Sequence, residues 1–323
     1  MKIAVLDDYQ RAFRNLACYA RLKDHEVQVF HDSEKDPIKL AERLKDADAV
    51  ILTQERSAFR RAIIEKLPKL KLVAQTGSHR NHLDIAACTE KGIIVAAPGT
   101  IRVGITTAEL TWGLILASLR HIPHEIEQLK NGVWQTTVGT GLHGKTLGVY
   151  ALGQIGSLVA QVGKAFGMKV TCWGREESRA KVLAAGYEMP ATREEFFGNA
   201  DVISLHIYFN DKTRGIVTAS DLACMKPDAL LVNTSRARLI EEGALVEALK
   251  RSRPGRAAVD VYEEEPVLNG NHPLLKMANV ICTPHLGYVA DTMFEGLYNT
   301  AIDSILGFAA GKPVNVLNPE VLR

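Results

Sequence analysis

The chain of 323 residues is 46% hydrophobic and 24% charged, a composition typical of a globular protein long enough for two domains. Its 39 basic and 37 acidic residues nearly cancel, which argues against a nucleic-acid or membrane surface. The N-terminal MKIAVLDDYQ is expected to be a strand rather than a signal peptide, and no apolar run approaches transmembrane length. Five scattered cysteines without a CxxC pair are typical of reduced thiols, so we expect a cytoplasmic location.

The first hundred residues alternate between strand-like and helix-like segments. The strands are expected at Ile3–Leu6, Val27–Phe30, Ala49–Leu52, Leu72–Ala74 and Ile93–Ala96. The amphipathic segments between them are Arg11–Leu22, Ile38–Leu44, Ala58–Leu67 and Leu83–Glu90. This alternation predicts a parallel sheet covered by helices on both faces. Pro98 and Gly99 end the pattern.

A long apolar helix is expected to carry the chain into a second lobe. Thr106 and Glu109 have the spacing of a capping box that would open this helix. The helix would run through Leu119 and be terminated by Pro123.

The stretch from Gly144 to Arg175 has the pattern of one strand–turn–helix–strand unit. Its parts are, in order, Thr146–Leu152, Gly153–Gly156, Ser157–Phe166 and Met168–Trp173. Glycine at 153 would let a phosphate approach the backbone, and glycine at 156 would let the helix pack on the strand. Ala151 occupies the first position of the usual GxGxxG pattern, so this turn alone is equally compatible with a purely structural role.

The second lobe continues the alternation. Strands are expected at Asp201–Ile207, Ala229–Asn233, Ala257–Tyr262 and Val280–Thr283, and helices at Ser220–Met225 and Glu241–Lys250. Polar residues collect at or just after the strand ends: Gly174, Arg175, His206, Thr234–Arg236, Asp260–Glu265 and His285. The carboxyl ends of parallel strands form the edge where open α/β sheets bind ligands.

A helical pattern over Ala290–Ala310 is expected to return to the first lobe. The predicted fold class is therefore α/β, with two doubly wound parallel-sheet domains and a cleft between them. We expect residues 1–99 and 290–323 to form one domain and residues 100–289 the other.

Five segments together resemble the D-isomer-specific 2-hydroxyacid dehydrogenase family: GKTLGVYALGQIG, NADVISLHIYFNDKTRG, MKPDALLVNTSRARLIEEGALVEAL, AAVDVYEEEP and CTPHLG. The resemblance covers most of the chain and is densest from Gly144 to Gly287. It implies a flavodoxin-like substrate domain, a Rossmann cofactor domain and a homodimer paired through the cofactor domain. One departure is Ala96, a position where the family often has asparagine.

The resemblance also implies roles for individual residues. The catalytic set would be Arg236, Glu265 and His285, and the substrate would be bound by Gly77, Ser78 and Arg236. With the turn Gly153, Gln154, Ile155 and Gly156 and with Arg175 after the second strand of the unit, the expected cofactor contacts also include Thr107, His206, Thr234 and Asp260.

The reduction of a 2-keto acid requires these residue types. A guanidinium clamps the carboxylate and polarises the carbonyl with one planar fork. A histidine donates the proton near neutral pH, and a carboxylate partner orients the imidazole and favours its protonated form. We therefore expect hydride transfer between a nicotinamide cofactor and a small 2-keto or D-2-hydroxy acid, with His285 as proton donor or acceptor.

Each candidate also has a structural interpretation. Arg236 is compatible with a surface ion pair, Glu263–Glu265 with a solvated acidic turn, and His285 with a loop histidine. Their common position at one sheet edge favours the catalytic interpretation. His79 and His82 have a spacing found in metal sites, but no second ligand pair accompanies them, so we expect no metal.

A function of another class is a dinucleotide-sensing interaction protein, because the same architecture resembles a transcriptional corepressor. The sequence has no basic arm beyond an enzyme-length core, which favours the enzyme.

The choice of cofactor depends on the end of the second strand of the central unit. NAD-binding proteins place an acidic residue about 20 residues after the glycines. Here that position is Gly174, followed by Arg175 and, four residues later, Arg179. A guanidinium binds a 2′-phosphate that an aspartate would repel, so we expect NADP(H) to be preferred over NAD(H), mainly through Arg175. The alternative is that Arg175 stacks on the adenine or faces solvent.

Overall fold

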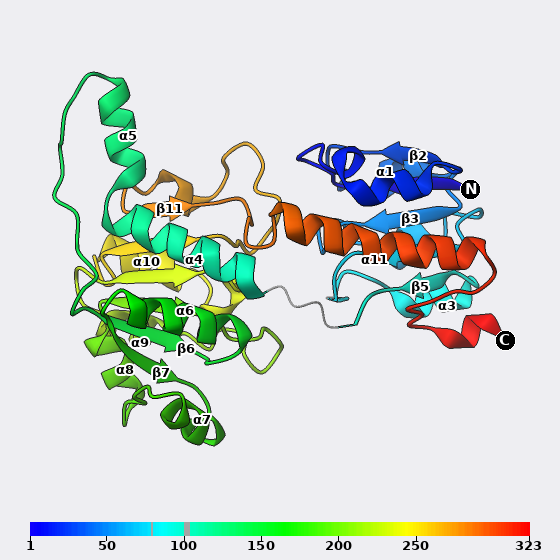
Figure 1. Cartoon of the computed structure of the whole chain (residues 1–323). Helices are drawn as coiled ribbons and strands as arrows, with labels where there is room; N and C mark the ends of the chain where they lie inside the picture. Colours follow the sequence, from blue (N-terminus) through cyan, green and yellow to red (C-terminus); the bar gives the residue numbers. More distant parts are fainter. Residues whose placement is uncertain (79, 100–103) are drawn as a thin grey trace. The chain divides into compact units, whose positions relative to one another are not determined.

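The computed structural model describes residues 1–78, 80–99 and 104–323, and it divides into two units (Figure 1). Unit 1 comprises Met1–Arg102 and Ala290–Arg323, and unit 2 comprises Val103–Val289. Each unit has one sheet, and its paired strands are parallel. The predicted fold class of two parallel-sheet α/β units is therefore confirmed.

The sheet of unit 1 has the strand order β2-β1-β3-β4-β5, which is the flavodoxin-like order. The strands are β1 (Lys2–Val5), β2 (Glu26–Val29), β3 (Ala49–Leu52), β4 (Leu72–Gln75) and β5 (Ile94–Ala96). Every residue of β3 and β4 is buried, as expected for central strands covered on both faces.

The α-helices of unit 1 are α1 (Pro37–Leu44), α2 (Arg61–Ile64), α3 (Ile85–Glu90) and α11 (Asp291–Ala309). Asp36 caps α1 by accepting a hydrogen bond from the N–H of Ile38 at 2.8 Å. The C-terminal helix α11 packs against β4 and runs along the sheet in Figure 1. A short 3₁₀ helix, Pro319–Leu322, follows it.

One helix expected in unit 1 is wrong in type. The segment Arg11–Leu22 forms two 3₁₀ helices, Phe13–Asn15 and Ala17–Leu22, instead of one α-helix. Leu16 is extended between them and interrupts the helical hydrogen bonds. Glu295 of α11 accepts hydrogen bonds from the N–H groups of Ala17 and Cys18 at 2.9 and 2.7 Å, so a residue distant in sequence fixes this break.

The sheet of unit 2 has the order β11-β10-β9-β8-β6-β7. The strands are β6 (Thr146–Tyr150), β7 (Lys169–Trp173), β8 (Val202–Leu205), β9 (Leu230–Asn233), β10 (Arg256–Val259) and β11 (Val280–Cys282). Strand β6 pairs with β7 on one side and with β8 on the other. The strand order thus changes direction between β6 and β8, a position where open parallel sheets bind ligands.

Helices cover both faces of this sheet. The α-helices are α4 (Gly104–Leu119), α5 (Ile122–Lys130), α6 (Gln154–Ala165), α7 (Arg179–Ala184), α8 (Arg193–Asn199), α9 (Ala219–Cys224) and α10 (Ala244–Lys250). The 3₁₀ helices are Glu176–Ser178, Ala237–Leu239 and Pro273–Lys276. Helices α4 and α6 pack against each other (Figure 1). Trp112 of α4 donates a hydrogen bond to the carbonyl of Val159 at 3.3 Å.

The expected boundaries of α4 need two corrections. Thr106 lies inside the helix and donates its hydroxyl hydrogen to the carbonyl of Gly287, so it does not form a capping box with Glu109. Pro123 does not terminate α4, which ends at Leu119. It occupies the first turn of α5, where the missing N–H leaves no helical hydrogen bond unmade.

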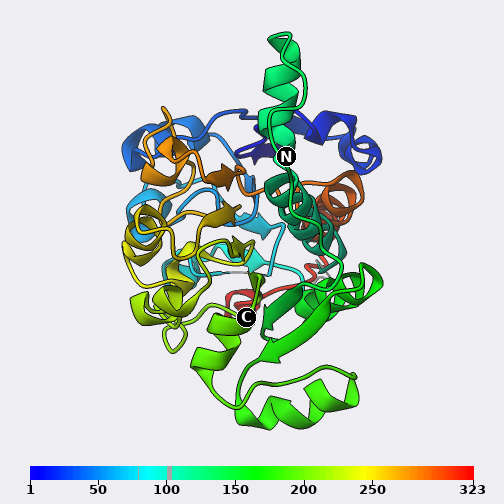
Figure 2. The same cartoon turned by 90° about the vertical axis from the view of Figure 1, so that its left-hand side faces the viewer.

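Residues 122–141 form an arm that projects from the rest of unit 2 (Figures 1 and 2). Helix α5 contains no buried residue. The carboxylate of Glu125 accepts hydrogen bonds from the hydroxyls of Thr136 and Thr137 at 2.9 and 2.6 Å. These bonds and the N–H of Thr136 lower the pKa of Glu125 to about 2, and they join the helix to the returning segment. Polar contacts therefore hold the arm together without a core of its own.

Candidate active site

A histidine–carboxylate pair lies at the carboxyl edge of the sheet in unit 2. Nδ1 of His285, which follows β11, is 2.5 Å from Oε2 of Glu265, which follows the neighbouring β10. The N–H of Tyr262 donates to the other carboxylate oxygen, Oε1, at 2.9 Å. Both side chains of the pair are half-buried. Glu265 therefore fixes the imidazole through Nδ1 and leaves Nε2 as the nitrogen available for proton transfer.

Glu265 carries a negative charge at neutral pH. Burial opposes its ionisation, but the hydrogen bond and charge of His285 outweigh burial, with help from the N–H of Tyr262 and the charge of Arg236. The pKa of Glu265 consequently lies below its ordinary value. The ionised carboxylate therefore holds the imidazole of His285 through a charge-assisted hydrogen bond at Nδ1.

The turn after β9 places Arg236 at the same edge. The side chain of Asn233, the last residue of β9, donates to the carbonyl of Arg236 at 3.0 Å and accepts from the N–H of Ser235 at 3.0 Å. Nη1 of Arg236 donates to the carbonyl of Ser235 at 2.8 Å. The three residues predicted as catalytic thus follow three adjacent strands: β9, β10 and β11.

Asp260 supports the loop that carries His285. Its side chain is fully buried, and it accepts hydrogen bonds from the hydroxyl of Thr283 at 2.6 Å and from the N–H groups of Leu286 and Gly287 at 2.7 and 2.9 Å. Burial raises the pKa of Asp260, and these hydrogen bonds oppose that rise.

The N-terminal turn of α4 holds the same loop from the other side. The hydroxyls of Thr106 and Thr107 each donate to the carbonyl of Gly287 at 2.9 Å. His285 has a positive φ of 53°, a conformation that a non-glycine residue keeps only where its surroundings enforce it. Sequence reasoning assigned Thr107 and Asp260 to the cofactor and missed their contacts with this loop.

The turn after β6 has the geometry of a phosphate-binding turn. Gly153 is the N-cap of the 12-residue helix α6, no side chain caps it, and no neighbouring atom lies near the position of an added Cβ. A Cβ on Gly156 would lie 2.2 Å from the carbonyl oxygen of Ala151, so glycine is required there for the helix to pack on the strand. Gln154 is exposed and Ile155 half-buried, so the first N–H groups of α6 are accessible to an anion. This turn fits a dinucleotide pyrophosphate.

Two further candidate cofactor residues follow β8 and β9. Nε2 of His206 is 2.8 Å from the hydroxyl of Ser204, while its buried Nδ1 has no partner among the residues that the structure describes. Burial lowers the pKa of His206 to about 3, so the ring is neutral. The hydroxyls of Thr234 and Thr111 are 2.8 Å apart. Because His206 lies beside the change in strand direction, its unpaired nitrogen is consistent with a cofactor position.

The two arginines after β7 differ in their contacts. Arg175 is exposed, and within the described part of the chain the structure gives it no ion pair. Arg179 is paired with Glu176, with Nε 2.6 Å from Oε1. A Cβ on Gly174 would meet only the side chain of Ser178, at 3.5 Å. There is room for a ligand group at Gly174, and of the two arginines Arg175 is the one whose guanidinium has no ion pair with a described residue.

The predicted substrate residues Gly77 and Ser78 lie in unit 1, directly after β4. Gly77 is buried and Ser78 half-buried. His82 is buried with Nε2 3.2 Å from Oε1 of Gln75, while His79 lies outside the described residues. Among the described residues, no group of three or more potential ligands has the geometry of a metal site.

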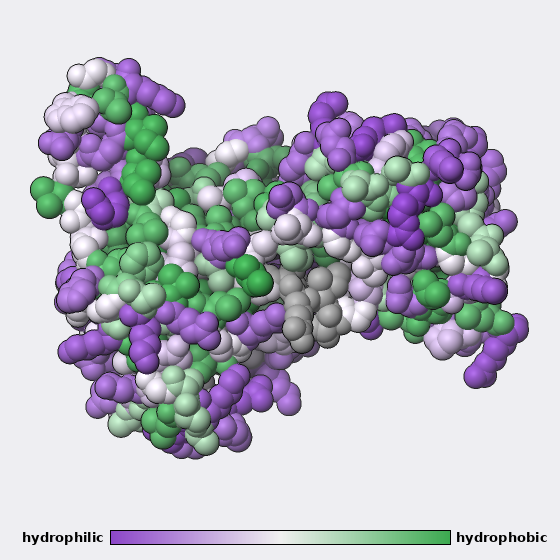
Figure 3. Space-filling view, in the orientation of Figure 1, coloured by the Kyte–Doolittle hydropathy of each residue, from purple (hydrophilic) through white to green (hydrophobic). Residues whose placement is uncertain are grey.

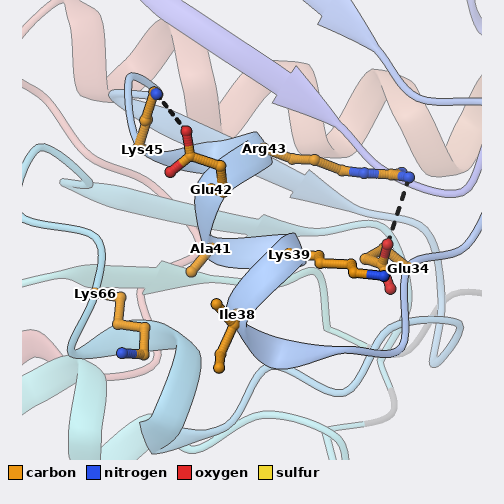
Figure 4. A pocket seen from close by; sticks show the side chains of 8 residues that line it. All are labelled: Glu34, Ile38, Lys39, Ala41, Glu42, Arg43, Lys45 and Lys66. Atoms are coloured by element: carbon orange, nitrogen blue, oxygen red, sulfur yellow. Dashed lines mark hydrogen bonds and ion pairs between the residues drawn. The ribbon is translucent and has the colours of Figure 1, made fainter.

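A shallow surface pocket of about 670 Å³ on α1 contains none of the predicted site residues (Figure 4). Its lining residues are Glu34, Ile38, Lys39, Ala41, Glu42, Arg43, Lys45 and Lys66. Arg43 is paired with Glu34 at 3.6 Å, and Lys45 is paired with Glu42. Exposed surface charges, several of them paired, give no reason to assign a ligand to this pocket.

Comparison with known proteins decides the family. Residues 112–287 match the family described as D-isomer specific 2-hydroxyacid dehydrogenase, NAD binding domain. The chain is 35% identical over 317 residues to a glyoxylate reductase of Aeropyrum pernix, covering 93% of this chain and 92% of the relative. The chain belongs to the D-isomer specific 2-hydroxyacid dehydrogenase family.

Other members of the family carry different names. A D-3-phosphoglycerate dehydrogenase of Methanocaldococcus jannaschii is 42% identical over 265 residues, which are 81% of this chain and 49% of that protein. The crystal structure of a phosphoglycerate oxidoreductase from Vibrio cholerae O395 has a TM-score of 0.92 and 47% identity, with 96% of this chain and 99% of that chain covered.

Family membership makes the chain an oxidoreductase with a nicotinamide-binding domain that acts on a 2-hydroxy or 2-keto acid. Among its described residues, no helix is both long enough and apolar enough to cross a lipid bilayer.

Proposed function

We propose that this dehydrogenase reduces small 2-keto acids to D-2-hydroxy acids, with His285 as the proton donor. The observation that carries the proposal is the 2.5 Å pair between His285 and Glu265, beside Arg236 at one sheet edge. In this proposal, residues 100–289 bind the dinucleotide, and residues 1–99 with 290–323 bind the substrate.

The three side chains divide the chemistry among them. Arg236 binds the substrate carboxylate and polarises the keto oxygen with its planar fork. His285 holds a proton on Nε2 for the developing alkoxide, and Glu265 stabilises the imidazolium and orients it through Nδ1. The nicotinamide supplies the hydride when it is bound.

The remaining binding residues follow from their positions in the fold. Gly77 and Ser78 present backbone N–H groups after β4 for the substrate carboxylate. The turn Gly153–Gly156 binds the pyrophosphate at the N-terminus of α6. Thr107, His206, Thr234 and Asp260 line the nicotinamide side, with Thr107 and Asp260 also fixing the loop of His285.

Purified enzyme tests this function by consumption of NADPH or NADH with a panel of 2-keto acids. The names of the relatives give the panel: glyoxylate, and the keto acid formed from 3-phosphoglycerate, with pyruvate and hydroxypyruvate between them in size. His285→Ala and Arg236→Ala should each lose most of the activity. Dinucleotide binding without turnover of any keto acid would instead favour the corepressor-like alternative. No contact among the described residues supports that alternative.

We also propose that NADP(H) is preferred over NAD(H). Arg175 lies next to Gly174 at the end of β7, and Arg179 contributes less because Glu176 already holds its guanidinium. Arg175→Ala should lower kcat/KM for NADPH about tenfold or more and leave that for NADH within about twofold. Arg179→Ala is the matched control and should change the ratio much less. Equal values for the two cofactors in the wild type contradict the proposal.

A homodimer paired through unit 2 completes the proposal. The arm exposes large apolar side chains: Ile122, Ile126, Leu129, Val133, Trp134 and Val138. In Figure 3 hydrophobic residues run along this arm. An arm without buried residues is expected to be covered, and a second copy is the partner that the family suggests. A cytoplasmic location is supported by five cysteines, all unpaired.

A further inference from the structure

Gln54, directly beyond β3 in unit 1, is held in an unusual backbone conformation. Its φ is 52°, in the left-handed region that side chains other than glycine rarely adopt. Its carbonyl accepts a hydrogen bond from Nε2 of Gln75 at 2.9 Å, and its N–H donates to the hydroxyl of Thr76 at 2.9 Å. Gln75 and Thr76 are both fully buried at the end of β4. Two buried polar side chains thus enforce the conformation of one residue at the carboxyl edge of the sheet.

The side chain of Gln54 lies against Gly77. A Cβ added to Gly77 would be 2.3 Å from Oε1 of Gln54 and 3.1 Å from its Nε2. The carboxamide thus occupies the space that a side chain at position 77 would need. Because Gln54 is half-buried, its carboxamide remains partly accessible beside the backbone of Gly77 and Ser78.

We propose that Gln54 determines substrate specificity by hydrogen bonding a hydroxyl group on C3 of the keto acid. The proposal rests on the proposed function, in which Gly77 and Ser78 bind the substrate carboxylate. A carboxylate bound there has its C3 substituent only a few bonds away, within reach of the carboxamide against Gly77. The preferred substrate class is therefore the 3-hydroxy-2-keto acids, such as hydroxypyruvate.

The chemistry of the carboxamide favours this class. It offers both an N–H donor and a carbonyl acceptor, so it can satisfy both halves of a hydroxyl group. Because the carboxamide is uncharged, it cannot form an ion pair with the phosphate group of a phosphorylated substrate. A substrate without the hydroxyl, such as pyruvate or glyoxylate, leaves the carboxamide to water and gains nothing from it.

The test compares kcat/KM for hydroxypyruvate, pyruvate, glyoxylate and 3-phosphohydroxypyruvate in Gln54→Gly and the wild type. Glycine accepts the positive φ, so this variant removes the side chain and keeps the backbone. We expect kcat/KM for hydroxypyruvate to fall about tenfold, while pyruvate and glyoxylate stay within about twofold. Gln54→Asn, which keeps an amide and tolerates the left-handed region, should recover part of the loss.

Gln28→Gly, which removes an exposed glutamine from β2 of the same unit, is the control and should leave all ratios unchanged. An equal fall for every substrate, an unchanged ratio, or a fall largest for the phosphorylated substrate overturns the role of Gln54. Wild-type enzyme without activity on any keto acid overturns the proposed function itself, so the two failures are distinguishable.

Discussion

The ionised Glu265 beside His285 determines how the proposed reduction depends on pH. A carboxyl group whose pKa is lowered in the folded protein stabilises it above the unfolded pKa, which is 4.5 here. That contribution is lost only as the pH falls through the lower, folded value. Between pH 5 and 9 Glu265 therefore stays ionised beside Nδ1 of His285.

Glu265→Gln is predicted to move the reductive activity profile to lower pH. The imidazolium loses the carboxylate that stabilises it, so less of the proton donor is present at neutral pH. The measurement is kcat for keto-acid reduction from pH 5 to 9, with an expected shift of about one pH unit. Glu263→Gln is the matched control, because Glu263 belongs to the same acidic run and contacts His272 at 3.0 Å. An unchanged midpoint in Glu265→Gln removes this residue from the mechanism.

Ala151 has a backbone conformation that costs free energy for alanine, at a position where the usual GxGxxG pattern has glycine. Its φ is 75°, which is unfavourable for alanine and free for glycine. Ala151→Gly is predicted to raise the free energy of unfolding by about 0.5–1 kcal/mol, after the greater chain entropy of glycine is deducted. Denaturant titration measures this change. Ala165→Gly, at the exposed end of the right-handed helix α6, should change the stability in the opposite direction. Destabilisation by Ala151→Gly contradicts the argument.

The positions of the strands could be predicted from the sequence. The conformation of segments that are held by residues distant in sequence could not. Buried parallel strands such as β3, and β9 up to Asn233, are continuous apolar runs, so their positions are visible in the sequence. The order of strand ends likewise brought Arg236, Glu265 and His285 to one edge. The break at Leu16 and the position of Thr106 depend on Glu295 and Gly287, contacts more than 150 residues away in sequence.

The same limit applies inside the candidate site. The sequence pattern predicted the types of the site residues and the strands that they follow. It did not predict which side chains form hydrogen bonds or ion pairs with each other. The pairing of Arg179 with Glu176 and the contact of Gln54 with Gly77 depend on side-chain geometry that spacing does not encode. The arm was missed because α5 has no buried face, and a buried face is what makes a helix recognisable in sequence.

Asp260 is predicted to act on catalysis through the loop after β11. In Asp260→Asn, one acceptor oxygen becomes an NH₂ group that faces donors from Thr283, Leu286 or Gly287, so the loop loses at least one hydrogen bond. We expect kcat to fall about tenfold or more at every pH, a larger effect than the rise in the dissociation constant for the cofactor.

Asp228→Asn is the control for this prediction, because Asp228 is an exposed residue just before β9. Weaker cofactor binding with unchanged kcat would show that Asp260 acts on the cofactor rather than through the loop of His285.

Each unit has several buried polar groups at the carboxyl ends of its strands. Unit 1 has Asp7, Thr53 and Gln75 there, and unit 2 has Asn233 and Asp260. Buried polar groups are costly unless they are hydrogen-bonded, so their concentration at these edges follows function rather than stability. The arm is the opposite case, because it exposes apolar groups where stability alone would bury them.

The exposed apolar side chains of the arm predict that a second copy of the chain covers it. Trp134 is 74% exposed and Val138 is 95% exposed, although polar bonds from Glu125 hold the arm in a fixed shape. If a second copy covers this surface, the wild type has twice the chain mass by light scattering, and Trp134→Glu weakens the dimer about 30-fold or more. Leu183→Glu changes a side chain that is 56% exposed on α7 and should leave the dimer intact. A wild-type monomer, or a Trp134→Glu dimer as stable as the wild type, rules out the arm as the interface.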